Sequence, residues 1–186
     1  VIDEFVEKVH EKEGVYYYQY GEEIRPISSY NVKLKFKQGD NIREKSITAY
    51  RSHHGPITHM TDDKWTSTAL MWKPIQALSQ SYLRTKTHNL EEFNKMMDMR
   101  TNSSNNTVYA DVKGNIAYYH GNFIPKRDIK FDYSEPVDGS NPSTDWKGLH
   151  SLAESIRVIN PPNGWIQNCN STPFTSAGEF SPKKEN

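Results

Sequence analysis

Two asparagines near the end of the chain have the residue type and spacing that could support acyl-transfer chemistry. Asn168 and Asn170 lie in residues 164–173, with the sequence GWIQNCNSTP, directly after the Asn-Pro-Pro turn at residues 160–162. A carboxamide NH2 held in a fixed position can stabilise the oxyanion that forms during amide hydrolysis. In an extended segment, positions two apart point to the same face, so the two side chains would lie together. On residue chemistry alone, asparagines that bond loop backbone are the commoner arrangement.

Three closely spaced histidines, His53, His54 and His59, are candidates for a metal site. Such a site would need histidines on one face of a strand or helix together with a carboxylate. Adjacent residues on a strand point to opposite faces, so His53 and His54 would diverge. We therefore favour the simpler interpretation, in which a strand ends here and turns at Gly55-Pro56.

Other residues with reactive side chains have ordinary structural explanations. Cys169 could be a nucleophile, but a lone cysteine is more often a small buried hydrophobe. Asp111 could be a general base, although a short acidic side chain beside Gly114-Asn115 more often bonds the turn. The acidic pairs at 62–63 and 91–92 suit helix N-termini, where negative charge complements the helix dipole. The chain has no G-x-S-x-G, no glycine-rich phosphate loop and no HExxH motif.

Composition points to a folded piece with much polar surface. The 186 residues carry 23 basic and 23 acidic side chains, and this balance gives no attraction to nucleic acid or membrane. Hydrophobic content is 34% and mean hydropathy −0.86. Aromatic residues nevertheless make up 12% of the chain, whereas disordered chains contain few aromatic residues. The single cysteine excludes an internal disulfide, and there is neither a membrane-spanning apolar run nor a signal-peptide pattern. Because the chain starts at Val1 without Met, we interpret its ends as boundaries set by processing.

The first third of the chain, residues 1–60, has the pattern of β-strands. Residues 15–20 are rich in tyrosine and valine, which favour strands. Residues 32–37 alternate apolar and charged side chains, the signature of a half-buried strand. A turn at 38–41 and a returning strand at 42–50 complete a predicted hairpin.

Residues 66–99 have helical spacing of apolar side chains. Pro74 must lie in the first turn of its helix or kink it. Asn89 is a predicted N-cap, with Glu92 three residues later completing a capping box. We therefore predict two helices in this segment.

Residues 107–173 are predicted to contain strands and long loops, including the asparagine-rich motif. A hairpin is expected from strands at 107–111 and 116–119 around a turn at 113–115. The order strands, helices, strands predicts an α+β fold, in which two helices pack on an antiparallel sheet. The whole chain, 1–186, is expected to form a single piece.

Five short blocks of residues, each occurring once, follow one another along the chain. They are Arg51-x-x-His54-Gly55-Pro56-Ile57, Tyr109-Ala110-Asp111-x-x-Gly114-Asn115-Ile116-x-Tyr118, Ile124-Pro125-x-Arg127, Trp146-x-Gly148, and Asn160-Pro161-x-x-Gly164-Trp165-Ile166-x-Asn168-x-Asn170-x-x-Pro173. Together they resemble the β chain of the penicillin acylase family, which includes penicillin, cephalosporin and acyl-homoserine-lactone acylases. The resemblance extends from about Asp3 to Pro173.

The resemblance implies an N-terminal-nucleophile hydrolase with a four-layer αββα core. In that family a precursor cleaves itself, and the new β chain begins with a serine whose hydroxyl attacks the amide. The α-amino group of the same serine is the base, and catalysis needs no cofactor. A backbone N–H and an asparagine side chain hold the oxyanion. The matching asparagine here is Asn170, while Asn168 is expected to support the loop.

The family also implies a structural calcium ion, binding partners and a cellular location. Asp3 matches one of the calcium carboxylates, and Ile2 and Tyr133 would supply backbone oxygens, which suit Ca²⁺. The implied partners are the α chain, the remainder of the β chain and a small N-acyl substrate, without nucleic acid or membrane. The implied location is the bacterial periplasm or the outside of the cell.

The large departure from the family is the nucleophile, since residue 1 is Val. The catalytic serine is therefore expected upstream, and this chain alone should be inactive. The parent would cleave an amide between a fatty or aromatic acyl group and an amine, so β-lactam, homoserine-lactone and lipopeptide substrates all stay open. Two alternatives are a non-catalytic structural or binding domain with the acylase fold, and a surface-binding module that uses the tyrosines of residues 16–20.

Overall fold

The computed structural model describes residues 1–102 and 104–184, which form two compact units. The strand-rich unit comprises residues 2–70 and 127–146. The helical unit comprises residues 71–126 and the described chain from residue 147 onward, together with Val1. Each unit has buried hydrophobic clusters of its own. No helix among the described residues is long and apolar enough to cross a membrane.

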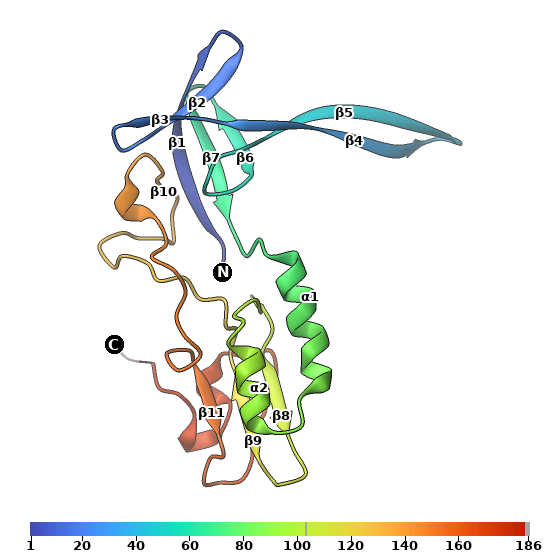
Figure 1. The fold of residues 1–186 in the computed structure, drawn as a ribbon, viewed down its shortest axis with the longest axis vertical. Helices are drawn as coiled ribbons and strands as arrows, with labels where there is room; N and C mark the ends of the chain where they lie inside the picture. Colours follow the sequence, from blue (N-terminus) through green and yellow to red (C-terminus); the bar gives the residue numbers. More distant parts are fainter. Residues whose placement is uncertain (103, 185–186) are drawn as a thin grey trace. The chain divides into compact units, whose positions relative to one another are not determined.

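A mixed sheet forms the body of the strand-rich unit, with strand order β3-β2-β1-β7-β6 (Figure 1). All neighbours are antiparallel except the short β10, which pairs in parallel with β1. The strands are β1 (Asp3–Lys12), β2 (Val15–Tyr20), β3 (Glu23–Pro26), β6 (Ile57–Thr61), β7 (Lys64–Ala69) and β10 (Val137–Asp138). Alternation along β1 buries Asp3, Phe5, Glu7 and Val9. Two carboxylates on one buried face require polar partners within the unit.

The helical region begins later than the sequence pattern predicts. Residues 64–69 form β7, which pairs on one side with β1 and on the other with β6. The run from Trp65 to Thr68 is rich in aromatic and β-branched side chains, which favour strands. Tertiary pairing therefore decides this segment, and the prediction of helix from residue 66 is wrong.

The predicted hairpin is confirmed as β4 (Ser28–Gln38) and β5 (Asn41–Arg51), a long two-stranded arm (Figure 1). Gly39 takes a left-handed φ of 61° in the tight turn, which glycine adopts without steric cost. The expected half-burial is wrong for most of the arm, because Leu34 and Phe36 are each nearly half exposed. Only Val32 on β4 is partly covered. An apolar face of this hairpin is left open within the described chain.

Three tyrosines of β2 pack in a core, while Tyr17 stacks on His10 of β1. Tyr18 is buried with Val9, Ile27 and Trp65, and Tyr16 and Tyr20 pack against this cluster. Because their rings are used in packing, the surface-binding module proposed from the sequence is wrong.

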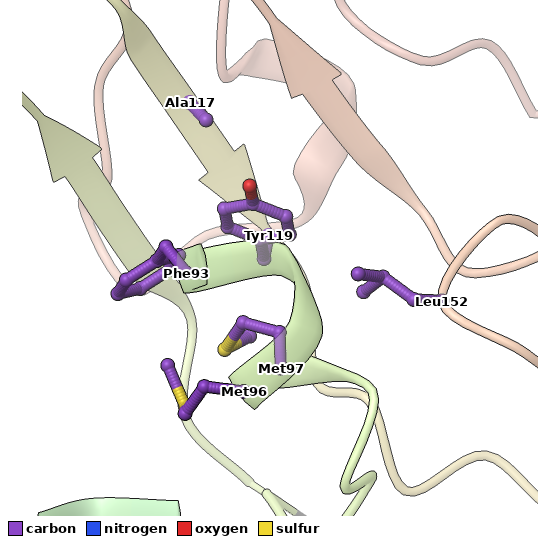
Figure 2. Packing of buried hydrophobic residues seen from close by; sticks show 6 residues of the cluster. All are labelled: Phe93, Met96, Met97, Ala117, Tyr119 and Leu152. Atoms are coloured by element: carbon purple, nitrogen blue, oxygen red, sulfur yellow. The ribbon is translucent and has the colours of Figure 1, made fainter. Parts of the chain in front are cut away.

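Two helices and a three-stranded antiparallel sheet form the helical unit, so the α+β class is confirmed. These elements are α1 (Pro74–Leu83), α2 (Leu90–Met97), β8 (Thr107–Ala110), β9 (Ile116–Tyr119) and β11 (Arg157–Ile159). Short 3-10 helices are η1 (Arg84–Lys86), η3 (Pro173–Thr175) and η4 (Gly178–Phe180), with η2 (Pro142–Thr144) in the other unit. Figure 2 shows the core, where Phe93, Met96 and Met97 of α2 meet Ala117 and Tyr119 of β9. Leu152, from the loop before β11, completes the cluster.

The predicted turn chemistry between β8 and β9 is confirmed. Asp111 accepts hydrogen bonds from the backbone N–H groups of Lys113 (2.9 Å) and Asn115 (3.0 Å), and from the Asn115 carboxamide (2.8 Å). These bonds, chiefly that from the Asn115 carboxamide, lower the pKa of Asp111. A carboxylate held in this way stabilises the hairpin and is a poor general base.

The predicted roles of Pro74 and Asn89 at the two helix starts are confirmed. Pro74 is in the first turn of α1, and Asn89 caps α2 by accepting from the Glu92 N–H at 2.9 Å. The Glu92 carboxylate returns to the Asn89 carboxamide and the His88 N–H, which completes the capping box.

We predict that Asn89→Ala lowers the free energy of unfolding by about 1 kcal/mol, because the partly buried N–H of Glu92 at the helix start loses its acceptor. Urea denaturation of the 186-residue chain, followed by far-UV circular dichroism, measures the change. Asn89→Ser keeps a capping oxygen and should lose only a few tenths of a kcal/mol. Equal losses for both variants would show that the cap does not account for the stability of α2.

Candidate functional site

A cleft of about 550 Å³ in the helical unit contains both asparagines singled out in the sequence. Its lining residues are Arg84, Ser104, Asn105, Asn106, His120, Asn168, Asn170 and Ser171. Asn106 precedes β8 and His120 follows β9, so the β8–β9 hairpin carries one wall. The other wall is the loop before η3, which carries the asparagine pair. The cleft is polar and suits a ligand that exchanges hydrogen bonds.

A chain of hydrogen bonds orients the first asparagine of the pair. The His120 Nδ1 is 2.8 Å from the Asn106 Oδ1, and the Asn106 Nδ2 donates to the Asn168 Oδ1 at 3.0 Å. Burial lowers the pKa of His120, which keeps the ring neutral near pH 7. An amide oxygen can only accept, so the His120 Nδ1 carries the proton of the first bond. His120 thereby fixes which way the Asn106 amide points.

Asn168 in turn holds the backbone of Asn170. Its Oδ1 accepts the Asn170 N–H at 3.2 Å, and Asn170 takes a left-handed φ of 54°, which asparagine tolerates better than most residues. The segment is therefore not extended, and the expectation of two side chains on one strand face is wrong. No described residue hydrogen-bonds the Asn170 carboxamide, which is exposed at the cleft. Its NH2 is free to donate to a ligand.

Sequence reasoning missed Asn106 and His120. The only local signal was the polar run at residues 101–106, which indicates a loop and nothing more. Cys169, between the two asparagines, is exposed rather than buried, so the expected packing role is wrong. No hydrogen bond or ion pair joins its thiol to a base within the described chain.

The carboxylate of Asp3 is fully engaged by two donors from the 127–146 segment. The Arg127 guanidinium reaches both oxygens, at 2.7 and 2.8 Å, and the Trp146 Nε1 donates at 2.6 Å. Tyr133 donates its hydroxyl to the Thr144 carbonyl. A calcium ion at Asp3 would have to displace the guanidinium, so these residues as they stand do not fit a calcium site. Calcium at Asp3, Ile2 and Tyr133 stays a prediction.

A second cluster, in the strand-rich unit, is centred on the buried ring of His54. The His54 Nδ1 lies 2.9 Å from the Glu7 Oε1, and its Nε2 lies 2.9 Å from the Asp145 Oδ1. Burial disfavours the charged ring, but hydrogen bonds to Asp145 and Glu7 outweigh it and raise the pKa of His54. Burial likewise raises the pKa of Glu7, and the bond to His54 outweighs it, so the net shift is downward. The Ser67 hydroxyl also donates to the Glu7 Oε1, at 2.7 Å.

His53 joins the same cluster instead of pointing away from His54. Its Nε2 lies 3.7 Å from the Asp145 Oδ1, and the two imidazole centroids are 3.8 Å apart. The strand β5 ends at Arg51, and the following loop lets Gly55 pack so tightly on β7 that a Cβ there would lie 2.0 Å from the Thr68 carbonyl oxygen. The prediction of divergent histidines is therefore wrong. His59 stays apart on β6, where its Nε2 bonds Thr61.

Comparison with known proteins places these features in one family. The family model "Penicillin amidase" matches residues 1–184. Penicillin G acylase from Escherichia coli is 30% identical over 178 residues, which is 92% of this chain and 20% of that protein. A thermostable penicillin G acylase structure from Alcaligenes faecalis superposes with a TM-score of 0.78 at 26% identity, covering all of this chain and 32% of that chain. The chain thus spans about a fifth to a third of the relatives it matches.

Proposed function

The chain belongs to the penicillin amidase family, and we propose that it forms part of the β chain of a hydrolase that cleaves the amide bond of N-acyl compounds. The observation that carries the proposal is the Asn170 carboxamide at the cleft, which no described residue hydrogen-bonds and whose backbone N–H is held by Asn168. When a nucleophile attacks an amide, the carbonyl oxygen gains negative charge. A donor fixed in advance stabilises that charge without reorganisation, which lowers the barrier.

The nucleophile we propose is a serine at the start of the parent β chain, upstream of this sequence. Its hydroxyl adds to the amide carbon, and its own α-amino group accepts the proton and later returns it to the leaving amine. An α-amino group has an unperturbed pKa of about 8, which suits this exchange near neutral pH. No cofactor takes part. Because this nucleophile lies outside the 186 residues, we propose that they are inactive on their own.

We further propose that the α chain and the remainder of the β chain cover apolar surface that is open here. On α1, Ile75, Leu78 and Tyr82 are each more than 60% exposed, and the β4–β5 hairpin adds Leu34 and Phe36. Exposed apolar side chains grouped on one element mark a site of protein contact. We also propose an exported bacterial parent, for which β-lactam, homoserine-lactone and lipopeptide amides are the candidate substrates.

Mass spectrometry of the parent, expressed with its native upstream region, tests the proposal. Two chains, the second beginning with serine, together with turnover of an N-acyl substrate, would support amide hydrolysis after self-cleavage. One uncleaved and inactive chain would instead support the alternative, a non-catalytic domain that retains the acylase fold.

The hydrogen-bond chain behind Asn170 makes a second prediction for the parent enzyme. Asn106→Ala should lower kcat about tenfold with little change in KM, because Asn168 loses the donor that orients it and the oxyanion donor is misplaced. Steady-state kinetics measure both constants.

A double-variant cycle separates positioning from an unrelated defect. In the Asn170→Ala background, Asn106→Ala should cause almost no further loss, because both substitutions act through the same donor. If the kcat losses of Asn106→Ala and Asn170→Ala multiply in the double variant, the positioning role of Asn106 is contradicted.

A further inference from the structure

We propose that His53, His54 and Asp145 form a binding site for one divalent transition-metal ion, Zn²⁺ in particular. The site lies wholly in the strand-rich unit and is independent of the proposed amide hydrolysis. Imidazole nitrogens with one carboxylate oxygen are a donor set that Zn²⁺ accepts, whereas Ca²⁺ and Mg²⁺ prefer oxygen alone.

The three donor atoms are already close to the spacing that a metal ion requires. One ring nitrogen of His53, one of His54 and one carboxylate oxygen of Asp145 all lie within 4.8 Å of one another. The Asp145 oxygen is 2.9 Å from the His54 nitrogen and 3.7 Å from the His53 nitrogen. Bonds of about 2.0–2.2 Å in a tetrahedral site place ligand atoms roughly 3.4 Å apart, so small side-chain shifts suffice.

Each candidate ligand is also held from behind, as metal ligands are in proteins. The His54 Nδ1 bonds the Glu7 carboxylate at 2.9 Å, which is the carboxylate–histidine arrangement that leaves Nε2 for a metal. The His53 Nδ1 bonds the Tyr18 hydroxyl at 2.9 Å. The second oxygen of Asp145 accepts from the Tyr20 hydroxyl at 2.5 Å. Each of the three candidate ligands therefore has its own supporting hydrogen bond, whereas an ordinary ion pair requires no such support.

The formal charges of the cluster favour a dication. Glu7 and Asp145 are both carboxylates, and the groups that bond them here are imidazoles and hydroxyls. The guanidinium of Arg25 is nearby over the Tyr20 ring, but it pairs with Glu23 at 2.8 Å. A bound Zn²⁺ would balance the two carboxylates while both imidazoles stay neutral.

The site has a route to solvent and a structural consequence. The His53 and Asp145 side chains are about 30% exposed, while His54 is almost fully buried, so an ion could enter from the outer side. Asp145 follows η2, and the two histidines lie between β5 and β6. A metal ion would therefore cross-link two segments that are about 90 residues apart in the sequence and leave one coordination position for water.

Isothermal titration calorimetry of the metal-free 186-residue chain with ZnCl2 tests the proposal. We expect one ion per chain and a melting temperature that rises with zinc concentration, because the ion binds the folded state. His53→Gln and Asp145→Asn, which keep side-chain size, should each weaken binding by more than about 100-fold, and Tyr18→Phe by about 10–100-fold. The single variants His59→Ala and Cys169→Ser should each leave zinc binding unchanged, since neither side chain belongs to the cluster.

Several results would overturn the site. These are no zinc binding at micromolar concentrations by a chain with native circular dichroism, or equal binding by wild type and His53→Gln, or loss of binding in the Cys169→Ser variant. The last would assign the ion to the thiol. His53→Gln decides the matter even if Asp145→Asn does not fold, because His53 is partly exposed and carries no buried charge. If any of these results were obtained, the cluster would be a network of ion pairs and hydrogen bonds without a metal ion.

Discussion

Replacing Asn170 with alanine in the complete, processed parent enzyme is expected to lower kcat about 10²–10³-fold, the usual cost of losing one oxyanion donor. Within the described chain the Asn170 carboxamide has no hydrogen-bond partner at the cleft, and its backbone conformation is held by Asn168. The oxyanion exists only in the transition state and the intermediate it leads to. KM should therefore change little, while kcat and kcat/KM fall together. Steady-state kinetics with an N-acyl substrate measure both.

Two further variants control this result. Asn170→Asp keeps the size of the side chain but replaces the donor with a negative charge, so its kcat should fall at least as far. Asn41→Ala changes an exposed asparagine at the start of β5 and should leave kcat unchanged. A kcat within twofold of wild type for Asn170→Ala would rule out the oxyanion role, even if the parent proves to be an amide hydrolase.

The features that could be predicted from the sequence are those determined by neighbours along the chain. The β8–β9 hairpin, the Asn89 cap and the bonding of Asp111 each depend on residues that are close together along the chain, and the structure confirms all three. The α+β class follows from the order of such local elements.

The features that could not be predicted depend on contacts between distant residues. Helix was expected from residue 66, but the segment forms β7 because β1 and β6 flank it. His53 and His54 meet because β5 ends before them, and Asp145 comes from about 90 positions away. Likewise, Asn106 lies 62 positions from the Asn168 that it orients. A single sequence contains no periodic pattern that pairs such residues.

Replacing Glu7 with alanine is expected to lower the free energy of unfolding by about 3–5 kcal/mol, the cost of removing one partner from a buried ion pair. Glu7 is fully buried on β1, and its Oε1 serves the His54 Nδ1 and the Ser67 hydroxyl together. The variant leaves a buried imidazole with Asp145 as its remaining carboxylate and a small cavity beside Gly139. Urea denaturation of the 186-residue chain in excess EDTA measures the loss without any contribution from bound metal.

Two glutamate variants separate this charge effect from a general defect in β1. Glu7→Gln keeps a carbonyl oxygen that can still accept from His54 and Ser67, so it should lose clearly less than alanine does, by about 1–3 kcal/mol. Glu4→Ala changes an exposed carboxylate on the opposite face of the same strand and should stay within about 0.5 kcal/mol of wild type. Equal losses for Glu7→Gln and Glu7→Ala would mean that the charge of Glu7 carries the stability. If Glu7→Ala were instead as stable as Glu4→Ala, the buried pair would contribute nothing, because desolvation of Glu7 and His54 would then cancel their attraction.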